Sequence, residues 1–229
     1  MNLTGKSLLD IGSGLGYFLD EAQKTGLDAT GIEPSKKFAA LSRKLYRTNV
    51  INADLELFFK NNRHKKYDFI TMINVIEHFN NPFKQIAIVS KLLKKDGILY
   101  LETPNYNSWL YMIEKEKYTF LTPPDHTYIF SSVSFSFLIK NDSSLKTRDT
   151  LTYSYPEHLM GILKNLLKNK KNQILLNDSM QANKENNIAI SKSKTIKYML
   201  FDKALSMISY KILNYFNYGS FLELYIRKI

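Results

Sequence analysis

The chain has 229 residues, of which 44% are hydrophobic, with a formal net charge of +11 and no cysteine. This length supports one domain with a sizeable core, and the lack of cysteine excludes disulfides, thiolate metal sites and a cysteine nucleophile. The N-terminus lacks the apolar region of a signal peptide and no stretch has the roughly 20 apolar residues of a membrane span, so we expect a cytoplasmic protein.

The first informative stretch is a short apolar strand followed by a glycine-rich turn. Residues 8–11 have the apolar character of a buried parallel strand, with Asp10 as the one charged member. A helix is predicted after them, from Tyr17 to Lys24. Between strand and helix stand three glycines at alternate positions, Gly12, Gly14 and Gly16. Backbone without a Cβ can turn sharply and approach a ligand closely, so this stretch predicts a binding turn; the alternative is a tight turn with no ligand.

The spacing of this turn argues against a dinucleotide as its ligand. A dinucleotide fingerprint would place its third glycine where Tyr17 stands, and Asp10 would repel a pyrophosphate. An acid there suits a cationic amino-acid group instead. Asp10 and the three glycines resemble the first motif of the class I methyltransferases that use S-adenosylmethionine. The resemblance implies that Asp10 and the turn, including Ser13 and Phe18, bind this cofactor at its methionine end.

The next two predicted strands each end in an acid. Residues 28–33 end at Glu33, before Pro34 and a helix over residues 36–47 that Ser35 caps; residues 50–54 end at Asp54, before a helix from Leu55 to Lys60. A carboxylate at a strand end can accept hydrogen bonds from both hydroxyls of a ribose. The resemblance implies this role for Glu33, with Pro34 beside it, and an adenine contact for Asp54 with Leu55. The alternative for Asp54 is a helix cap, and the two roles are compatible.

Residues 67–78 carry the fourth predicted strand and the loop after it. Ligands of open α/β sheets bind beyond the carboxyl ends of the strands, so we expect Asn74 and Val75 to contact the cofactor. Glu77 and His78 then fall near the transferred methyl group, and the alternative for His78 is a loop histidine packed on the sheet. The run from Val75 to His78, followed by Asn81-Pro82, resembles the small-molecule branch that includes ubiquinone-biosynthesis and sugar O-methyltransferases.

Two negative predictions come from the same loop. The chain lacks the Asp/Asn-Pro-Pro-Tyr motif of the amino-methylating nucleic-acid enzymes here, so a nucleic-acid substrate is not expected. The resemblance to the ubiquinone-pathway enzymes implies that acids and a histidine at this place could bind a metal ion. In this chain, however, Asn74 stands where one of those acids would be. Glu77 and His78 alone do not make a metal site, so we expect no required metal.

An aromatic-rich segment, residues 106–128, follows a fifth strand predicted over residues 98–105. Its ending, from Pro124 to Ser131, resembles the lid segment of the family, in which a histidine precedes an aromatic residue and a helix-capping Ser or Thr. Loops at this edge of a sheet form the acceptor pocket and exclude water. His126 is therefore our preferred general base, and the alternative is that it only orients the lid.

The last third of the chain predicts an insertion between two hairpin strands. Residues 145–155 suit a sixth strand after a helix over residues 131–140, and residues 219–228 match the closing antiparallel strand of the family. The methyltransferase domain would comprise residues 1–156 and 217–229, and residues 157–216 would form a helical basic insertion. From Glu157 onward 12 Lys and Arg face 5 Asp and Glu, a balance that suits nucleic acid, an anionic membrane surface, an anionic substrate or simply a solvated face. Its apolar stripe favours core packing or a homodimer contact over peripheral membrane binding.

These patterns predict an α/β, Rossmann-like doubly wound sheet, mostly parallel with an antiparallel last strand and helices on both faces. We expect an S-adenosylmethionine-dependent methyltransferase acting on a hydroxyl of a small polar acceptor such as a sugar or nucleotide-sugar; a quinone-like phenol is the second choice. A non-catalytic cofactor-binding or scaffold protein is the rival from another class. Members of the family usually carry a few tens of residues before the first strand, so the chain is short, truncated, or covered at its pocket by the insertion.

Overall fold

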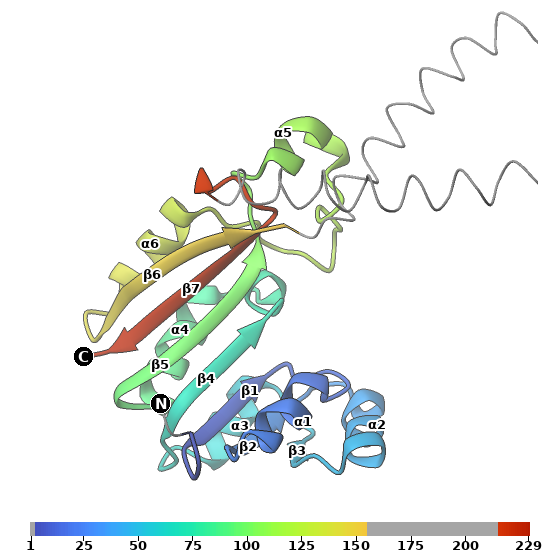
Figure 1. Ribbon diagram of the computed structural model, residues 1–229, viewed down its shortest axis with the longest axis vertical. Coiled ribbons are helices and arrows are strands. Elements are labelled where there is room, and N and C mark those ends of the chain that lie inside the picture. Colours follow the sequence, from blue (N-terminus) through green and yellow to red (C-terminus); the bar gives the residue numbers. More distant parts are fainter. Residues whose placement is uncertain (1–2, 155–214) are drawn as a thin grey trace, which may run out of the picture.

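The computed structural model describes residues 3–154 and 215–229, which build a seven-stranded sheet in the order β3-β2-β1-β4-β5-β7-β6 (Figure 1). The first five strands pair in parallel, whereas β7 runs antiparallel to both β5 and β6. The strands are β1 (Ser7–Ile11), β2 (Asp28–Ile32), β3 (Val50–Ile51), β4 (Tyr67–Ile73), β5 (Leu93–Pro104), β6 (Leu145–Tyr153) and β7 (Phe221–Lys228). The predicted Rossmann-like fold with an antiparallel last strand is confirmed.

Helices cover the sheet from both faces (Figure 1). They are α1 (Tyr17–Lys24), α2 (Lys36–Tyr46), α3 (Leu55–Asn61), α4 (Pro82–Leu92), α5 (Trp109–Glu114) and α6 (Ser132–Lys140), with short 3-10 turns η1 (Ile76–His78) and η2 (Lys115–Lys117). Polar side chains determine where several of them begin, because each accepts a hydrogen bond from a backbone N–H group of the first turn. These caps are Ser35, Asp54, Asn81, Ser108 and Ser131.

The described residues form a large and a small apolar cluster on the sheet and a third cluster of Trp109, Leu110 and Tyr118 in the aromatic-rich segment. The large cluster joins the inward residues of the central strands, such as Leu9, Ile70 and Leu99, to those of α4 and α6. The small cluster joins Leu8 and Ala29 to Leu19 of α1 and Ala39 of α2. Parallel strands buried on both faces need near-continuous apolar runs, which explains the composition of β1 and β4.

Some element boundaries differ from the predicted ones. β5 begins at Leu93 and not at Ile98, because the buried Leu93 pairs with Tyr67 before the two strands come back into register at Phe69 and Ile98. β3 is shorter than predicted and ends at Ile51. The predicted helices of the insertion fall within residues 155–214, which are outside the described part of the chain.

The search for membrane-spanning segments covers the described ranges alone. Within residues 3–154 and 215–229, every helix is too short or too polar to cross a bilayer.

Candidate functional site

The glycine turn between β1 and α1 adopts the backbone conformation that its sequence predicts. Gly12, Gly14 and Gly16 all have positive φ, at 71°, 53° and 82°. A Cβ on Gly16 would collide with Ser42 Oγ, and one on Gly12 would crowd Val75, whereas one on Gly14 would meet nothing within 4 Å. Gly12 and Gly16 are therefore required for packing, and Gly14 presents bare backbone to open space.

Glu33, at the end of β2, is held in place by the same turn. Its side chain is 7% exposed, and its two oxygens accept hydrogen bonds from Gly14 N–H at 2.9 Å and Ser35 N–H at 2.8 Å. Asn52 Nδ2 in turn donates to the backbone oxygens of Glu33 and Pro34, both at 2.9 Å. A carboxylate oxygen can accept more than one hydrogen bond, so Glu33 retains capacity for hydroxyl groups of a ligand.

A cleft of about 480 Å³ lies at the carboxyl ends of β1, β2 and β4. Acids and exposed backbone occupy part of its wall, and apolar side chains such as Ile11, Ile32 and Phe38 form the rest. The predicted cofactor-binding residues that the structure brings together in this wall are Gly12, Gly14, Glu33, Pro34, Asp54, Leu55, Asn74 and Val75. The volume and the mixed wall are typical of a small-molecule site.

Four predicted cofactor-binding residues are not among those that line this cleft. Gly16 packs against Ser42, and Ser13 Oγ is buried without a hydrogen-bond partner in the described structure. Phe18 instead lines a separate apolar cavity of about 490 Å³ on the sheet.

Asp10 is the fourth of these residues, and it lies buried in the sheet. Burial raises the pKa of Asp10 to about 7, with a further contribution from the charge of Glu33, while the hydrogen bond from Thr71 Oγ1 at 2.7 Å opposes the change. A ligand cation at Asp10 would favour the ionised form of this carboxyl.

Asp54 and Asn74 have structural tasks in addition to their place in the cleft. Asp54 Oδ1 accepts a hydrogen bond from Leu57 N–H at 2.7 Å, so the predicted helix cap exists. Asn74 has a φ of 53°, a left-handed conformation that asparagine tolerates better than most residues. Its N–H and Nδ2 donate to the backbone oxygen and Oε1 of Glu102, at 2.9 Å and 3.3 Å. The turn after β4 is thus tied to β5.

Glu77, His78 and His126 form a cluster at the rim of the cleft, where His78 is also a lining residue. The two imidazole rings are 4.8 Å apart between centroids, at an interplanar angle of 68°. Glu77 is 1% exposed, its Oε2 accepts a hydrogen bond from Thr103 Oγ1 at 3.0 Å, and its Oε1 has no partner in the described part of the chain. Burial raises the pKa of the Glu77 carboxyl, while the Thr103 bond and the nearby histidines oppose the change.

Backbone carbonyl groups determine the tautomer of both histidines. His78 Nδ1 is 2.7 Å from Asp125 O, and His126 Nδ1 is 2.6 Å from Phe120 O. A carbonyl oxygen only accepts, so each Nδ1 must carry a proton and each neutral ring keeps a lone pair on Nε2. Both rings are therefore prepared to accept a proton there.

The lid that carries His126 is fastened directly to Glu77. The backbone oxygen of Glu77 accepts hydrogen bonds from Thr127 N–H at 2.8 Å and Tyr128 N–H at 3.2 Å. Aromatic contacts stiffen the rest of the segment: the rings of Tyr106 and Tyr111 are 4.2 Å apart, and those of Tyr111 and Tyr118 are 5.3 Å apart. The lid thereby brings His126 close to Glu77, which lies 49 positions earlier in the chain.

The three side chains of the cluster each offer a ligand atom within 4.8 Å of the others, a set that could hold a divalent metal ion. Sequence reasoning considered Glu77 with His78 and missed that His126 completes a triplet. It also missed Thr103 and Glu102, whose only sequence signal is their place at the end of β5. That no metal is required stays a prediction.

Comparison with known proteins identifies related sequences. A family model described as a methyltransferase domain matches residues 2–141. A ubiquinone biosynthesis O-methyltransferase of Pasteurella multocida is 28% identical over 141 residues, which cover 55% of this chain and 58% of that protein. One of Glaesserella parasuis is 33% identical over 119 residues, or 48% and 50% of the two chains. The chain thus spans about half the length of the curated relatives it matches.

Solved structures share the fold at low sequence identity. A SAM-dependent methyltransferase from Archaeoglobus fulgidus superposes with a TM-score of 0.62 at 17% identity, covering 100% of this chain and 88% of its own. The plantazolicin methyltransferase BpumL, solved in complex with SAH, has a TM-score of 0.56 at 18% identity, covering 97% and 76%.

Proposed function

The chain belongs to the methyltransferase domain family, and we propose that it transfers a methyl group from S-adenosylmethionine to a hydroxyl group of a small acceptor. One observation carries the hydroxyl assignment: the buried Glu77, whose Oε1 has no hydrogen-bond partner within residues 3–154 and 215–229, lies beside two imidazoles that each keep a lone pair on Nε2. Hydroxyl groups must lose a proton during methylation, and this cluster can take it.

The cleft beside the cluster fits the cofactor. Glu33 would accept hydrogen bonds from the ribose hydroxyls, the bare backbone at Gly14 allows close approach, and the apolar wall suits an adenine ring. Asp10 would provide the negative charge toward the cationic amino group. S-adenosylmethionine, when bound there, supplies a methyl group on a positively charged sulfur and is already an activated donor.

The proposed reaction requires the transfer of one proton, from the acceptor hydroxyl to a residue of this chain. In the proposed reaction His126 Nε2 would accept the hydroxyl proton of the acceptor as the acceptor oxygen bonds to the methyl carbon; the carbon–sulfur bond of S-adenosylmethionine would break, and S-adenosylhomocysteine would leave. The Phe120 carbonyl holds the opposite edge of the ring, and the Glu77 carboxylate stabilises the imidazolium that results. His78 is the alternative base, with the Asp125 carbonyl in the equivalent place. Such general-base catalysis contributes about 10²–10⁴-fold to a rate.

Two acceptor classes follow from different observations. The aromatic lid, with Tyr106 43% exposed, offers stacking surfaces for the ring of a sugar or nucleotide-sugar, which is our first choice. The ubiquinone biosynthesis O-methyltransferases among the relatives favour the second choice, a quinone-like phenol.

The test is methyl transfer from radiolabelled S-adenosylmethionine to two acceptor panels, one of nucleotide-sugars and one of dihydroxybenzenes. Calorimetric titration with S-adenosylhomocysteine measures the cofactor site separately, so a folded but inactive protein is recognised. Label in either panel that disappears in His126→Ala supports the proposal. Binding of S-adenosylhomocysteine without turnover of any acceptor would favour the scaffold alternative.

A further inference from the structure

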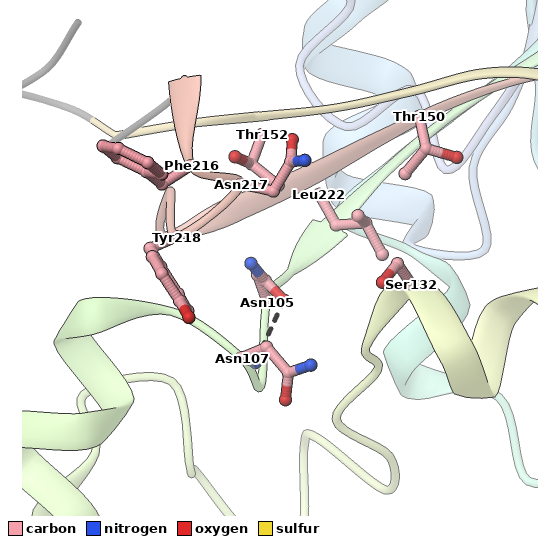
Figure 2. Close-up of a pocket in the computed structure, with 9 residues that line it drawn as sticks. All are labelled: Asn105, Asn107, Ser132, Thr150, Thr152, Phe216, Asn217, Tyr218 and Leu222. Carbon is pink, nitrogen blue, oxygen red and sulfur yellow. Dashed lines mark hydrogen bonds between the residues drawn. The ribbon is translucent and has the colours of Figure 1, made fainter. Parts of the chain in front are cut away.

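A second cavity, of about 390 Å³, opens among the carboxyl end of β5, the start of α6 and the β6–β7 edge (Figure 2). Its volume falls within the range of about 300–1,000 Å³ that is common for small-molecule sites. None of its described lining residues also lines the cofactor cleft, and the methylation proposed above makes no use of it.

The polar part of this lining consists of neutral amide and hydroxyl groups. Its members are Asn105, Asn107, Asn217, Ser132, Thr150 and Thr152. Asn105 and Thr152 are engaged with the backbone of Gly219, to which Asn105 Nδ2 donates at 2.8 Å and from which Thr152 Oγ1 accepts at 3.2 Å.

The remaining polar side chains have capacity for a ligand. In the part of the chain that the structure describes, no hydrogen bond is made by the side chains of Asn107, Asn217, Ser132 and Thr150. The described lining contains no charged side chain, although the chain as a whole carries a net +11. A charged ligand would thus find no counter-charge, and a neutral ligand rich in hydroxyls finds both donors and acceptors.

Two aromatic rings stand at one end of the cavity, and Thr150 and Ser132 lie toward the other (Figure 2). Phe216 is 60% exposed and Tyr218 is 42% exposed, so their rings are available to a ligand. The face of an aromatic ring is electronegative and attracts polarised C–H groups. A sugar ring combines such C–H faces with a rim of hydroxyls, which matches aromatic rings at one end and amides and hydroxyls along the wall.

We propose that this cavity binds a neutral hexose ring, with its C–H face on Phe216 and Tyr218 and its hydroxyls on Asn107, Asn217 and Thr150. The site is separate from the cofactor cleft. It concerns binding alone and does not depend on which acceptor is methylated.

The test is saturation-transfer NMR on the full chain with the methyl α-glycosides of glucose, galactose and mannose, in the presence of S-adenosylhomocysteine. N-acetylalanine methylamide serves as a peptide-like probe. Asn217→Gly deletes one amide, and glycine keeps the backbone φ of 60° that position 217 adopts. Thr150→Val removes one hydroxyl at nearly constant shape, and Thr147→Val on the same strand, outside the cavity, is its matched control.

We expect saturation transfer to at least one glycoside, with affinity about tenfold weaker in Asn217→Gly and Thr150→Val and unchanged in Thr147→Val. S-adenosylhomocysteine binding should be the same in all variants, which separates this inference from the proposed function. If Asn217→Gly does not fold, Thr150→Val with its control still decides. No transfer to any glycoside, equal transfer in all variants, or transfer to the peptide-like probe alone would each overturn the hexose site.

Discussion

Asp10→Asn should make the protein more stable at neutral pH while weakening cofactor binding. Asp10 is 3% exposed and accepts a hydrogen bond from Thr71, which an asparagine oxygen can also accept. Because burial and the charge of Glu33 raise its pKa from 3.8 to about 7, the folded protein binds a proton here that the unfolded chain has already lost. The favourable contribution of Asp10 is therefore complete below about pH 4 and is lost as the pH rises through about 7.

The magnitude follows from the two pKa values. A difference between 3.8 and about 7, at about 1.4 kcal/mol for each pKa unit, corresponds to about 4 kcal/mol. The wild type should lose this amount of unfolding free energy between about pH 4 and pH 7, and Asp10→Asn should not lose it. The contributions of other titrating groups to the unfolding free energy cancel when the variant is compared with the wild type at each pH.

Urea unfolding of both proteins at a series of pH values measures this difference, and Asp68→Asn is a control of opposite sign. Burial alone would raise the pKa of Asp68, but its hydrogen bonds to Lys94 and Ser7 lower it. Asp68→Asn should thus be less stable than the wild type at neutral pH, and its deficit should shrink as the pH falls through the low pKa of Asp68. A difference between Asp10→Asn and wild type that does not change with pH would refute the reasoning.

The same carboxyl connects stability to ligand affinity. If only the ionised form of Asp10 pairs with the amino group of S-adenosylmethionine, wild-type affinity should rise with pH up to about 7 and level off above it. Asp10→Asn should bind more weakly at neutral pH and lack this pH dependence. Calorimetric titration across the same pH series checks both statements, and equal affinity of the two proteins at pH 8 would remove Asp10 from the cofactor site.

Glu33→Ala should weaken S-adenosylmethionine binding at least about tenfold if Glu33 is the carboxylate partner of the ribose, as proposed. Calorimetry with the exposed Glu21→Ala as control checks this, and unchanged affinity would contradict the assignment. His126→Ala should lower kcat by about 10²–10⁴-fold with S-adenosylhomocysteine affinity preserved, and a normal kcat would point to another base. Gly16→Ala should lower the thermal unfolding temperature more than Gly14→Ala does. Both substitutions strain a positive φ, but only the one at Gly16 also adds a collision with Ser42. Equal losses of stability in the two variants would contradict this reasoning. Dialysis against EDTA should leave activity unchanged, and loss of activity restored by Mg²⁺ or Zn²⁺ would show that the Glu77 cluster holds a metal.

Local signals explain which parts of the fold could be predicted from the sequence. The helix Tyr17–Lys24 was predicted to its ends, because glycines precede it and Gly26 follows it. Ser35 could be recognised as a cap because a serine hydroxyl before a helical run satisfies a free N–H group, whereas the capping role of Ser131 was implied by the resemblance of its segment to the family. The early start of β5 could not be predicted, since Leu93 joins the sheet only through its pairing with Tyr67.

The candidate site was predictable where it lies at strand ends; His126 was predicted from the resemblance of its segment to the family, but its contact with Glu77 was not. Glu33 and Asn74 follow their strands directly, and Asp54 stands a few residues after β3, so topology brings all three to one cleft. His126 reaches Glu77 through backbone hydrogen bonds at the lid, which leave no pattern in the sequence. The three-dimensional packing also separates residues that spacing could not: Asp10 is buried behind the cleft lining, whereas Phe18 is 40% exposed and lines the separate cavity on the sheet.

The attachment of the lid to Glu77 couples the position of the lid to the geometry of the histidine cluster. Thr127 and Tyr128 donate to the backbone oxygen of the residue whose carboxylate faces the histidines, and the Asp125 carbonyl that holds the His78 ring belongs to the same lid. If this segment opens for exchange of ligands, these bonds break, His126 moves away from Glu77 and the ring of His78 loses the Asp125 carbonyl. Under the function proposed above, the base would then be assembled only while the segment is closed over the acceptor.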